Sequence, residues 1–322
     1  MRFSRLTAMI LIATLHFVFP VLLIVWTWIR SYTSITALIV QVLVLISYMA
    51  FIFLMGSWVF ASFYLRYVVL ILAIVVAVLS LLDQRNLPLF LKPDMTGWAG
   101  YGVGVILTAV LTYFTVGAIR SHFYDETPIN IAFPFKNGAY AVFEGGNGKA
   151  SSLINYHYGA SKHKGAGINL SMRYAVDITK LTRWGNDADG FLPVQNEKYG
   201  VFNQVVCSPC DGEVFEVEDK WPNETPWSGN PPYNLGNHIM ITSNEFGVLM
   251  GHLQKGSILV KIGDQVLKGQ PLAQAGNSGW TSQPHLHIQA MKVSTGSFWG
   301  WKGMPIFFHG RNPVKNSLFF EH

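Results

Sequence analysis

The chain has 322 residues, enough for two domains; half of them are hydrophobic and only 13% are charged. Residues 1–120 hold seven of the 23 basic residues and two of the 18 acidic ones, so the remainder carries 16 of each and the formal charge of +5 belongs to the apolar N-terminal part. That distribution is typical of basic residues that flank membrane spans, and it argues against a nucleic-acid partner.

Four apolar stretches come first in the chain, and each is close to the roughly 20 residues that a helix needs to cross a membrane. None has the polar stripe of a helix on the surface of a soluble protein. We therefore expect a membrane domain over residues 1–122, embedded in the lipid bilayer, with spans near 7–29, 34–55, 61–82 and 98–119. Arg2 and Arg5 resemble the start of a signal peptide, but the apolar core is long for a cleaved one, which favours an uncleaved helix.

The orientation of these spans is not decided by charge. An even number of spans places Met1 and the residues after Arg120 on the same side of the membrane. That side would hold four basic residues and the opposite side three, which is too small a difference for the positive-inside rule. The two groups are Arg2, Arg5, Arg66 and Arg120 against Arg30, Arg85 and Lys92.

After Arg120 the sequence is typical of an all-β domain, in which short β-rich runs alternate with Gly, Asn, Asp and Pro turns. We expect a linker over 123–132 and an antiparallel, groove-forming domain over 133–322. Two long loops, 187–208 and 221–236, are of the kind that bind ligands on a small β scaffold. The expected strands are 138–143, 175–178, 212–217, 238–242, 248–252, 258–260 and 285–290.

The chain has only two cysteines, Cys207 and Cys210, which excludes a four-cysteine zinc ribbon and a disulfide scaffold. The pair leads into residues 211–215, which we interpret as a turn between strands. A redox pair would need the helix N-terminus that lowers the pKa of a thiol, and that context is missing. A small disulfide and two buried thiols remain the alternatives.

Histidines and an aspartate occupy positions typical of a metal site. His285 and His287 are two residues apart in an expected strand, so their imidazoles face the same side. His252 ends another expected strand. Asp177 interrupts an apolar run, where a carboxylate must be paired, hydrogen-bonded or metal-bound. Three such ligands and an open position for water are the composition of a catalytic zinc site.

The order of these motifs resembles that of the lysostaphin/LytM-type zinc endopeptidases, which cut peptide bonds in bacterial cell-wall peptidoglycan. The resemblance covers residues 133–313 and implies an antiparallel sheet that forms a groove, with one zinc ion at its floor. By position it implies Asp177 and His287 as zinc ligands, and His252 and His285 as the histidines that activate water and stabilise the oxyanion. The motifs are Asp177, CSPCDG at 207–212, GNHIMI at 236–241, GHL at 251–253, GNSG at 276–279 and PHLH at 284–287.

One position departs from the family pattern. The usual first ligand is a histidine four residues before the aspartate, and Arg173 stands there with a guanidinium that cannot bind zinc. The segments 155–158 and 172–177 resemble a branch of the family with an Asn-His-His-Tyr segment before a Gln-Arg-Tyr-Ala-x-Asp segment, which makes His157 the expected replacement. His163 is the alternative. We expect Asn237 and Arg173 to line the substrate groove.

The resemblance implies a membrane-anchored zinc endopeptidase that hydrolyses peptidoglycan stem or cross-bridge peptides, held in the bacterial inner membrane with its peptidase domain outside the cytoplasm. Arg173 supports an alternative: a metal-free relative that binds cell-wall peptides or activates another hydrolase. Such a relative would have no chemical need for His252, His285 and His287 together. A carrier domain is a third hypothesis, since residues 263–270 resemble the hairpin of lipoyl and biotinyl carriers, but here Lys292 follows the hairpin instead of preceding it.

Overall fold

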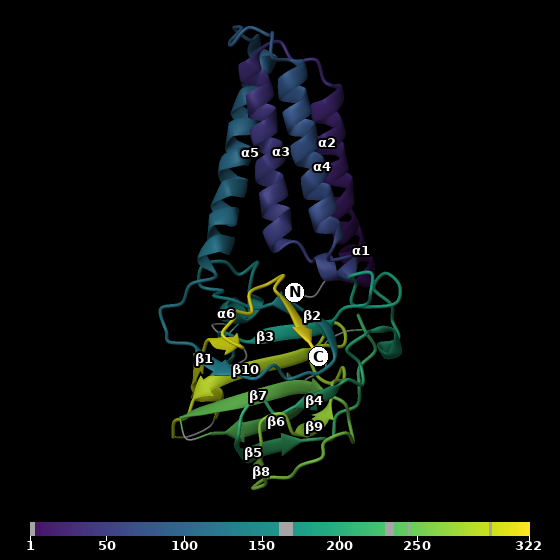
Figure 1. The fold of residues 1–322 in the computed structure, drawn as a ribbon, viewed down its shortest axis with the longest axis vertical. Coiled ribbons are helices and arrows are strands. Elements are labelled where there is room, and N and C mark those ends of the chain that lie inside the picture. Colours follow the sequence, from purple (N-terminus) through teal and green to yellow (C-terminus); the bar gives the residue numbers. More distant parts are fainter. Residues whose placement is uncertain (1–3, 161–169, 229–234, 244, 296–297) are drawn as a thin grey trace.

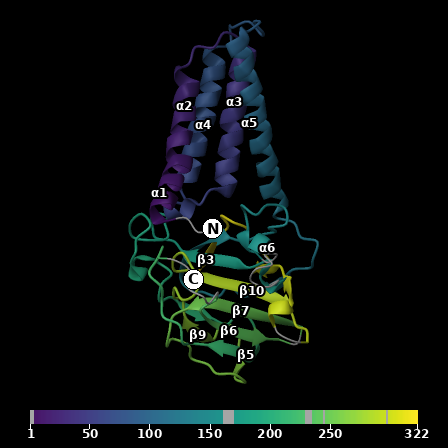
Figure 2. The same cartoon turned by 180° about the vertical axis from the view of Figure 1, so that it is seen from behind.

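A computed structural model describes residues 4–160, 170–228, 235–243, 245–295 and 298–322. These residues form a bundle of long helices that stands on a β domain (Figure 1). The view from behind shows the same two layers, with the first helix and the end of the last helix both reaching the β domain (Figure 2). The predicted order of a helical domain followed by an all-β domain is confirmed.

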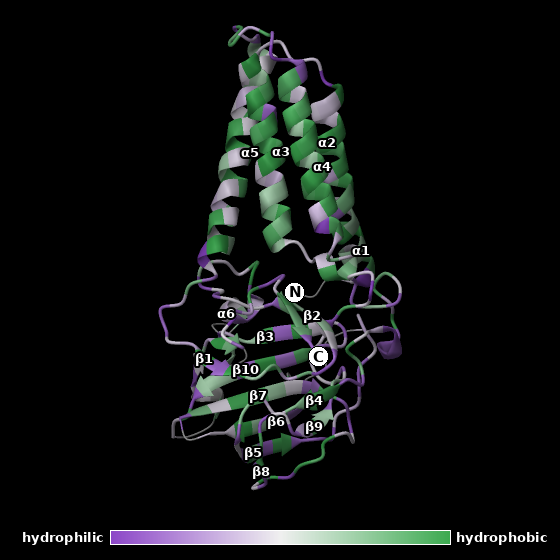
Figure 3. Cartoon of the chain, in the orientation of Figure 1, coloured by the Kyte–Doolittle hydropathy of each residue, from purple (hydrophilic) through white to green (hydrophobic). Residues whose placement is uncertain are grey.

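The bundle contains four helices that are long and apolar enough to cross a membrane, as predicted. The first runs from Arg5 to Ile29 and is built of α1 (Arg5–Ala13), a π-helical turn (Thr14–Val18) and α2 (Phe19–Ile29). The other three are α3 (Ile35–Met55), α4 (Leu65–Asp83) and α5 (Met95–Arg120). Hydrophobic residues cover nearly the full length of each helix (Figure 3). Membrane anchoring therefore rests on length and composition.

Local capping explains where two of these helices begin. The Ser34 side chain accepts a hydrogen bond from the Ala37 N–H, and the Asp94 side chain accepts one from the Gly97 N–H, which satisfies amides left open at a helix N-terminus. The third span begins later than the predicted residue 61. The connection after α3 instead forms a short 3₁₀ turn, Trp58–Phe60, and α4 starts at Leu65.

The β domain is built on one nine-stranded sheet whose neighbouring strands are antiparallel. Along the main path the strands are β13 (Leu318–Glu321), β2 (Gly138–Glu144), β3 (Val176–Lys180), β10 (Leu286–Lys292), β7 (Phe246–Leu253), β6 (Asn237–Thr242), β5 (Gly212–Glu218) and β8 (Gln265–Val266), and β11 (Lys302–Met304) also pairs with β10. Two small sheets flank it: β1 (Ile129–Ile131) with β12 (Ile306–Phe308), and β4 (Val205–Cys207) with β9 (Pro271–Gln274).

The central strand β10 separates the core from the candidate site. Leu286, Ile288 and Ala290 alternate along it and belong to the main hydrophobic core. His287 and Gln289 point to the opposite face, because side chains alternate across a strand, and both are buried there as well. A short helix, α6 (Tyr156–Ala160), covers that face beside β3 (Figure 2).

Six of the seven predicted strand runs are strands, and the run 258–260 is not. There the Leu259 N–H donates to the Leu272 carbonyl, but no ladder forms. Part of the predicted linker 123–132 forms regular structure. Residues Ile129–Ile131 form β1, which pairs in parallel with β12, and the Tyr124 hydroxyl donates to Asn312. The strands that were not predicted have only two to four residues, too few to show an alternating pattern: β1, β4, β8, β9, β11, β12 and β13.

Candidate metal centre

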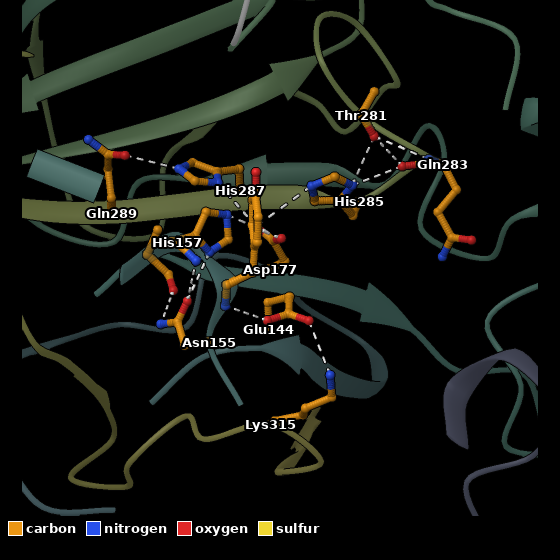
Figure 4. Close-up of polar contacts among 12 residues, drawn as sticks. Glu144, Asn155, His157, Asp177, Thr281, Gln283, His285, His287, Gln289 and Lys315 are labelled. Atoms are coloured by element: carbon orange, nitrogen blue, oxygen red, sulfur yellow. Dashed lines mark hydrogen bonds and ion pairs between the residues drawn. The ribbon is translucent and has the colours of Figure 1, made fainter. Parts of the chain in front are cut away.

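Two neighbouring strands and one short helix bring three predicted metal ligands together. Asp177 in β3 and His287 in β10 are direct partners in the strand register, and cross-strand partners have Cβ atoms about 5 Å apart. His287 Nδ1 lies 3.1 Å from Asp177 Oδ1, and His157 Nε2, from α6, lies 3.5 Å from Asp177 Oδ2. The candidate ligand atoms of the three residues all lie within 4.8 Å of one another (Figure 4).

The position of His157 depends on contacts around the start of α6. Asn155 Nδ2 donates to the carbonyls of Gly146 and Ala175, and Asn155 Oδ1 accepts from the His157 N–H. Glu144 Oε2 accepts from the Tyr156 N–H at 2.9 Å. These bonds satisfy backbone amides at the N-terminus of the helix, which have no partner within it. They also fix the direction of the His157 imidazole.

In each histidine ligand, a hydrogen bond to the ring nitrogen that faces away from Asp177 determines which nitrogen carries the proton. Since Asn155 Nδ2 donates elsewhere, its Oδ1 accepts from His157 Nδ1 (3.1 Å) and leaves the Nε2 lone pair facing Asp177. Gln289 Nε2 likewise donates to Ser171 Oγ, so Gln289 Oε1 accepts from His287 Nε2 (3.0 Å) and leaves the Nδ1 lone pair facing Asp177. Lone pairs of two imidazoles and a carboxylate thus converge, an arrangement that requires a cation or a shared proton.

Replacing Gln289 with leucine is expected to lower zinc affinity by about 10- to 100-fold, the usual cost of losing a partner that orients a metal-binding histidine. The change removes the acceptor that holds His287 Nε2 and leaves an apolar side chain at this position. Competition with a chelator of known affinity measures the effect. The control is Gln289→Glu, which retains an acceptor at this position. If the leucine variant keeps wild-type affinity, the Gln289 bond does not orient His287.

Two further histidines face the same cluster from neighbouring strands. His252 lies in β7 with φ of 62°, a left-handed conformation that is uncommon for this residue and occurs opposite a register shift between β6 and β7. Such irregularities often redirect a side chain beside an active site. The rings of His252 and His285 have their centroids 4.6 Å apart, and His285 Nε2 lies 3.6 Å from Asp177 Oδ1.

Both of these histidines present Nε2 to the site. The carbonyl of Ser278 accepts from His252 Nδ1 at 2.7 Å, and the carbonyl of Gln283 accepts from His285 Nδ1 at 2.8 Å. A carbonyl can only accept, so Nδ1 carries the proton in each ring. Nε2 is therefore the unprotonated, basic nitrogen of each ring.

The charges in the cluster favour metal binding. The pKa of His157 is lowered to about 4, mainly by burial; Asp177 opposes this shift, and the nearby His287 and His285 contribute to it. The pKa of His252 also lies well below its ordinary value, mainly because of burial and then because of His285 and His287. Burial acts to raise the pKa of Asp177, but the imidazoles around it outweigh that effect and lower it. A neutral imidazole and an ionised carboxylate are the forms that bind a metal.

Glu144 and Lys315 stand behind α6 and were not identified from the sequence. Lys315 Nζ lies 3.1 Å from Glu144 Oε1, with little of either side chain exposed. Burial raises the pKa of Glu144, and Lys315 counteracts that shift. Lys315 thus holds one carboxylate oxygen of Glu144 (Figure 4), while the other accepts from the Tyr156 N–H. Only the tertiary fold brings these two residues together.

Asp187 begins the predicted loop 187–208, and the structure buries it. Only 2% of its surface is exposed, and Asp187 Oδ2 accepts a hydrogen bond from Gln283 Nε2 at 2.5 Å. Burial raises the pKa of Asp187 to about 7, and the bond from Gln283 opposes the shift. This pair could not be predicted, because Gln283 is 96 residues away along the chain.

The raised pKa of Asp187 predicts a pH-dependent stability. The folded state binds the proton more tightly than the unfolded state, so this residue's contribution is fully present below its ordinary pKa of 3.8 and is lost as pH rises to about 7. We expect the free energy of unfolding to fall across this interval by up to a few kcal/mol relative to Asp187→Asn, which cannot ionise. The only two cysteines are both buried in the β domain, so their reaction with a dithiopyridine reagent, active in acid, reports its unfolding. Identical pH profiles for the two proteins would contradict the prediction.

The structure does not bring Arg173 or Asn237 into the cluster. The Arg173 guanidinium lies over the Tyr158 ring, 5.7 Å from its centroid. Asn237 is buried, accepts from the Trp221 N–H, and donates to the carbonyls of Trp221 and Leu253, so its amide holds backbone segments together. Their predicted place in a substrate groove stays a prediction. His163, the alternative ligand, lies outside the described residues.

His238, His309 and the two cysteines have local roles. His238 contacts Glu216 and the Gly236 carbonyl, and His309 contacts Glu321 near the surface. Cys207 and Cys210 lie at the turn between β4 and β5 as buried free thiols. Burial raises the pKa of both, to about 11 for Cys210, which suppresses thiolate chemistry.

Comparison with known proteins identifies the family that the β domain resembles. Residues 199–298 match the model of peptidase family M23. The match includes His252, His285 and His287, and it begins after Asp177 and His157. The predicted resemblance to lysostaphin/LytM-type peptidases is thereby confirmed over this part of the chain.

Individual relatives match parts of the chain. Glycyl-glycine endopeptidase ALE-1 of Staphylococcus capitis is 33% identical over 150 residues, which cover 46% of this chain and 33% of the relative. The chain thus spans about a third of the length of that curated relative. The solved structure of LytU is 26% identical, covers 30% of this chain and 58% of its own, and has a TM-score of 0.24. The catalytic domain of lysostaphin from Staphylococcus simulans is 24% identical, with coverages of 41% and 75% and a TM-score of 0.27.

Proposed function

We propose that this chain is a membrane-anchored zinc endopeptidase that hydrolyses peptide bonds in peptidoglycan stem or cross-bridge peptides. The observation that carries the proposal is the cluster of His157, Asp177 and His287, whose lone pairs converge within 4.8 Å. His252 and His285 add two basic nitrogens beside it. A ligand set together with separate proton acceptors is what hydrolysis requires, and a binding module has no need for it.

The donor set fits zinc. Two imidazole nitrogens and one carboxylate oxygen form a three-residue set of the kind used in catalytic zinc sites, where a fourth position stays open for water. We expect one zinc ion per chain, held by His157 Nε2, Asp177 and His287 Nδ1. When bound, zinc supplies a Lewis acid that polarises the scissile carbonyl and acidifies water.

His252 and His285 would then manage the proton. Each has its Nδ1–H held by a backbone carbonyl, so each Nε2 can accept a proton from the attacking water. The same nitrogen, once protonated, can donate to the leaving amine or to the oxyanion that develops on the scissile carbonyl. The rings lie 4.6 Å apart between centroids, close enough for both to act on one substrate carbonyl.

The family match and the relatives support the proposed substrate class. The curated relative is named as a glycyl-glycine endopeptidase, which supports a peptide cross-bridge or stem as substrate here. Such a substrate requires the β domain to lie outside the cytoplasm, with the helices in the bacterial inner membrane. Reporter fusions placed after Arg120 test this topology, and a cytoplasmic result would exclude peptidoglycan as the direct substrate.

The full-length chain, purified in detergent, provides the decisive test. We expect one zinc per chain by elemental analysis and release of new amino termini from purified peptidoglycan. The alternative, a metal-free relative that binds cell-wall peptides, is supported by Arg173 at the usual position of the first ligand. Zinc-free protein that binds peptidoglycan without cleaving it would establish that alternative and exclude the peptidase.

A further inference from the structure

The connection between α3 and α4 contacts the β domain beside the candidate site. We call residues 57–64 the membrane hairpin loop. Three hydrogen bonds join it to residues 184–187: the Asp187 N–H donates to the Val59 carbonyl (2.9 Å), the Phe63 N–H to the Gly185 carbonyl (2.6 Å), and Ser62 Oγ to the Trp184 carbonyl (2.6 Å). In both views this connection lies against the β domain (Figures 1 and 2).

Apolar packing completes the contact. Val59 and Phe63 are almost fully buried in one cluster with Ala141 of β2 and Leu181, which follows β3. Farther along the chain, Asn316 Nδ2 donates to the carbonyls of Leu54 and Gly56 at the end of α3. The loop therefore packs against β2 and against the residue that follows β3, the strand that carries Asp177. A flexible tether would not need such contacts.

One route from the loop to His285 runs through hydrogen bonds. The Asp187 N–H is held by Val59, and Asp187 Oδ2 accepts from Gln283 Nε2. The carbonyl of Gln283 in turn accepts from His285 Nδ1, the bond that leaves His285 Nε2 facing Asp177 (Figure 4). Asp187 and Gln283 are both buried, and a buried carboxylate is costly unless its partners are retained.

A second route runs through an aromatic contact. The Phe143 and His285 rings form a T-shaped pair, with centroids 5.2 Å apart and planes at 83°. Phe143 also packs against the cluster formed by Val59 and Phe63. Two different sides of His285 are thus supported by groups that touch the same loop.

We propose that the membrane hairpin loop is a positioning element of the peptidase, which holds His285 in its working orientation through Asp187 and Gln283 on one side and Phe143 on the other. The inference rests on the proposed function, in which His285 handles the proton. A shift of about 1 Å in a reacting group can cost about 100-fold in rate. A movement of α3 against α4 would therefore change the rate of hydrolysis without touching a zinc ligand.

Two glycines in the connection between β3 and β4, Gly185 and Gly190, provide a matched pair of variants. A Cβ atom at Gly185 (φ +81°) would lie 2.7 Å from Tyr64 Cδ2 and 3.2 Å from the Phe63 nitrogen, inside the contact with the loop. Gly190 also has a positive φ, +104°, but a Cβ atom there meets nothing within 4 Å. Gly185→Ala disturbs the loop contact, and Gly190→Ala controls for the backbone strain alone.

In full-length protein in detergent we expect Gly185→Ala to lower kcat on soluble cross-linked peptidoglycan fragments by about 10- to 100-fold, with KM and zinc content unchanged. Gly190→Ala should retain the wild-type kcat. Hydrogen exchange in peptides that cover residues 281–288 should increase in Gly185→Ala and not in Gly190→Ala. Protection of Cys207 and Cys210 from a thiol reagent verifies that each variant is folded.

A second pair tests the hydrogen-bonded route without disturbing the loop. Asp187→Leu removes the acceptor for Gln283, whereas Asp187→Asn keeps one. We expect the leucine variant to lose kcat at constant KM and zinc content, and asparagine to restore most of that loss. If Gly185→Ala does not fold, the two Asp187 variants test the positioning role by themselves.

The outcomes separate this inference from the proposed function. A wild-type chain with neither zinc nor hydrolysis removes the proposed function itself. An active wild type, together with a folded Gly185→Ala or Asp187→Leu variant that has wild-type kcat and wild-type exchange at 281–288, overturns only the positioning role of the loop.

Discussion

Replacing His157 with alanine is expected to remove zinc from the chain and with it all measurable hydrolysis. His157 Nε2 is one of only three ligand atoms in the cluster of the described residues, and its Nδ1 is already held by Asn155. Losing an orienting partner costs about 10- to 100-fold in metal affinity, so losing the ligand itself should cost more. Elemental analysis after dialysis against a weak chelator measures the zinc that remains.

The matched control is His309→Ala, which removes an exposed histidine that contacts Glu321 far from the cluster. It should keep one zinc per chain. Asp177→Ala should behave as His157→Ala does, since Asp177 contacts all three neighbouring imidazoles. Full zinc content and full activity in His157→Ala would show that another residue, with His163 the first candidate, replaces the usual ligand.

Several parts of the site could be predicted because they depend on local geometry. Side chains two residues apart in a strand point to the same face. His285 and His287 could therefore be placed on one face without knowledge of the fold. Asp177 stood out because a carboxylate inside an apolar run needs a partner. The four spans were evident from length and apolarity, and the structure shifts their ends by only a few residues.

The groups that orient these residues could not be predicted, because they depend on strand register and on contacts between distant segments. Gln289 reaches Ser171 across 118 residues, and Gln283 reaches Asp187 across 96. A sequence shows neither the pairing of β10 with β3 nor the direction in which an amide points. The contact between the membrane hairpin loop and residues 184–187 could not be predicted for the same reason. In the sequence the loop is only a short connection between two spans.

Alanine at His252 or at His285 is expected to leave zinc bound and to lower kcat by about 100- to 10,000-fold, the range for loss of a general acid or base. Neither residue belongs to the three-ligand cluster, and each has its Nδ1–H held by a backbone carbonyl, which leaves Nε2 as the unprotonated nitrogen of the ring. His238→Ala is the control: a buried histidine of the neighbouring strand β6 whose contacts, Glu216 and Gly236, lie outside the cluster.

The pH profile separates a proton-handling role from a structural one. Because burial and the neighbouring imidazoles lower the pKa of His252, its ring stays neutral as pH falls through the ordinary range of histidine, near 6.5. Wild-type kcat/KM should therefore persist below that range and decline only when Nε2 becomes protonated. The residual activity of His252→Ala should lack this acidic limb, and the double variant with His285→Ala should fall by less than the product of the single losses, since the two rings act on one carbonyl. Loss of zinc in either single variant would instead assign that histidine to the metal.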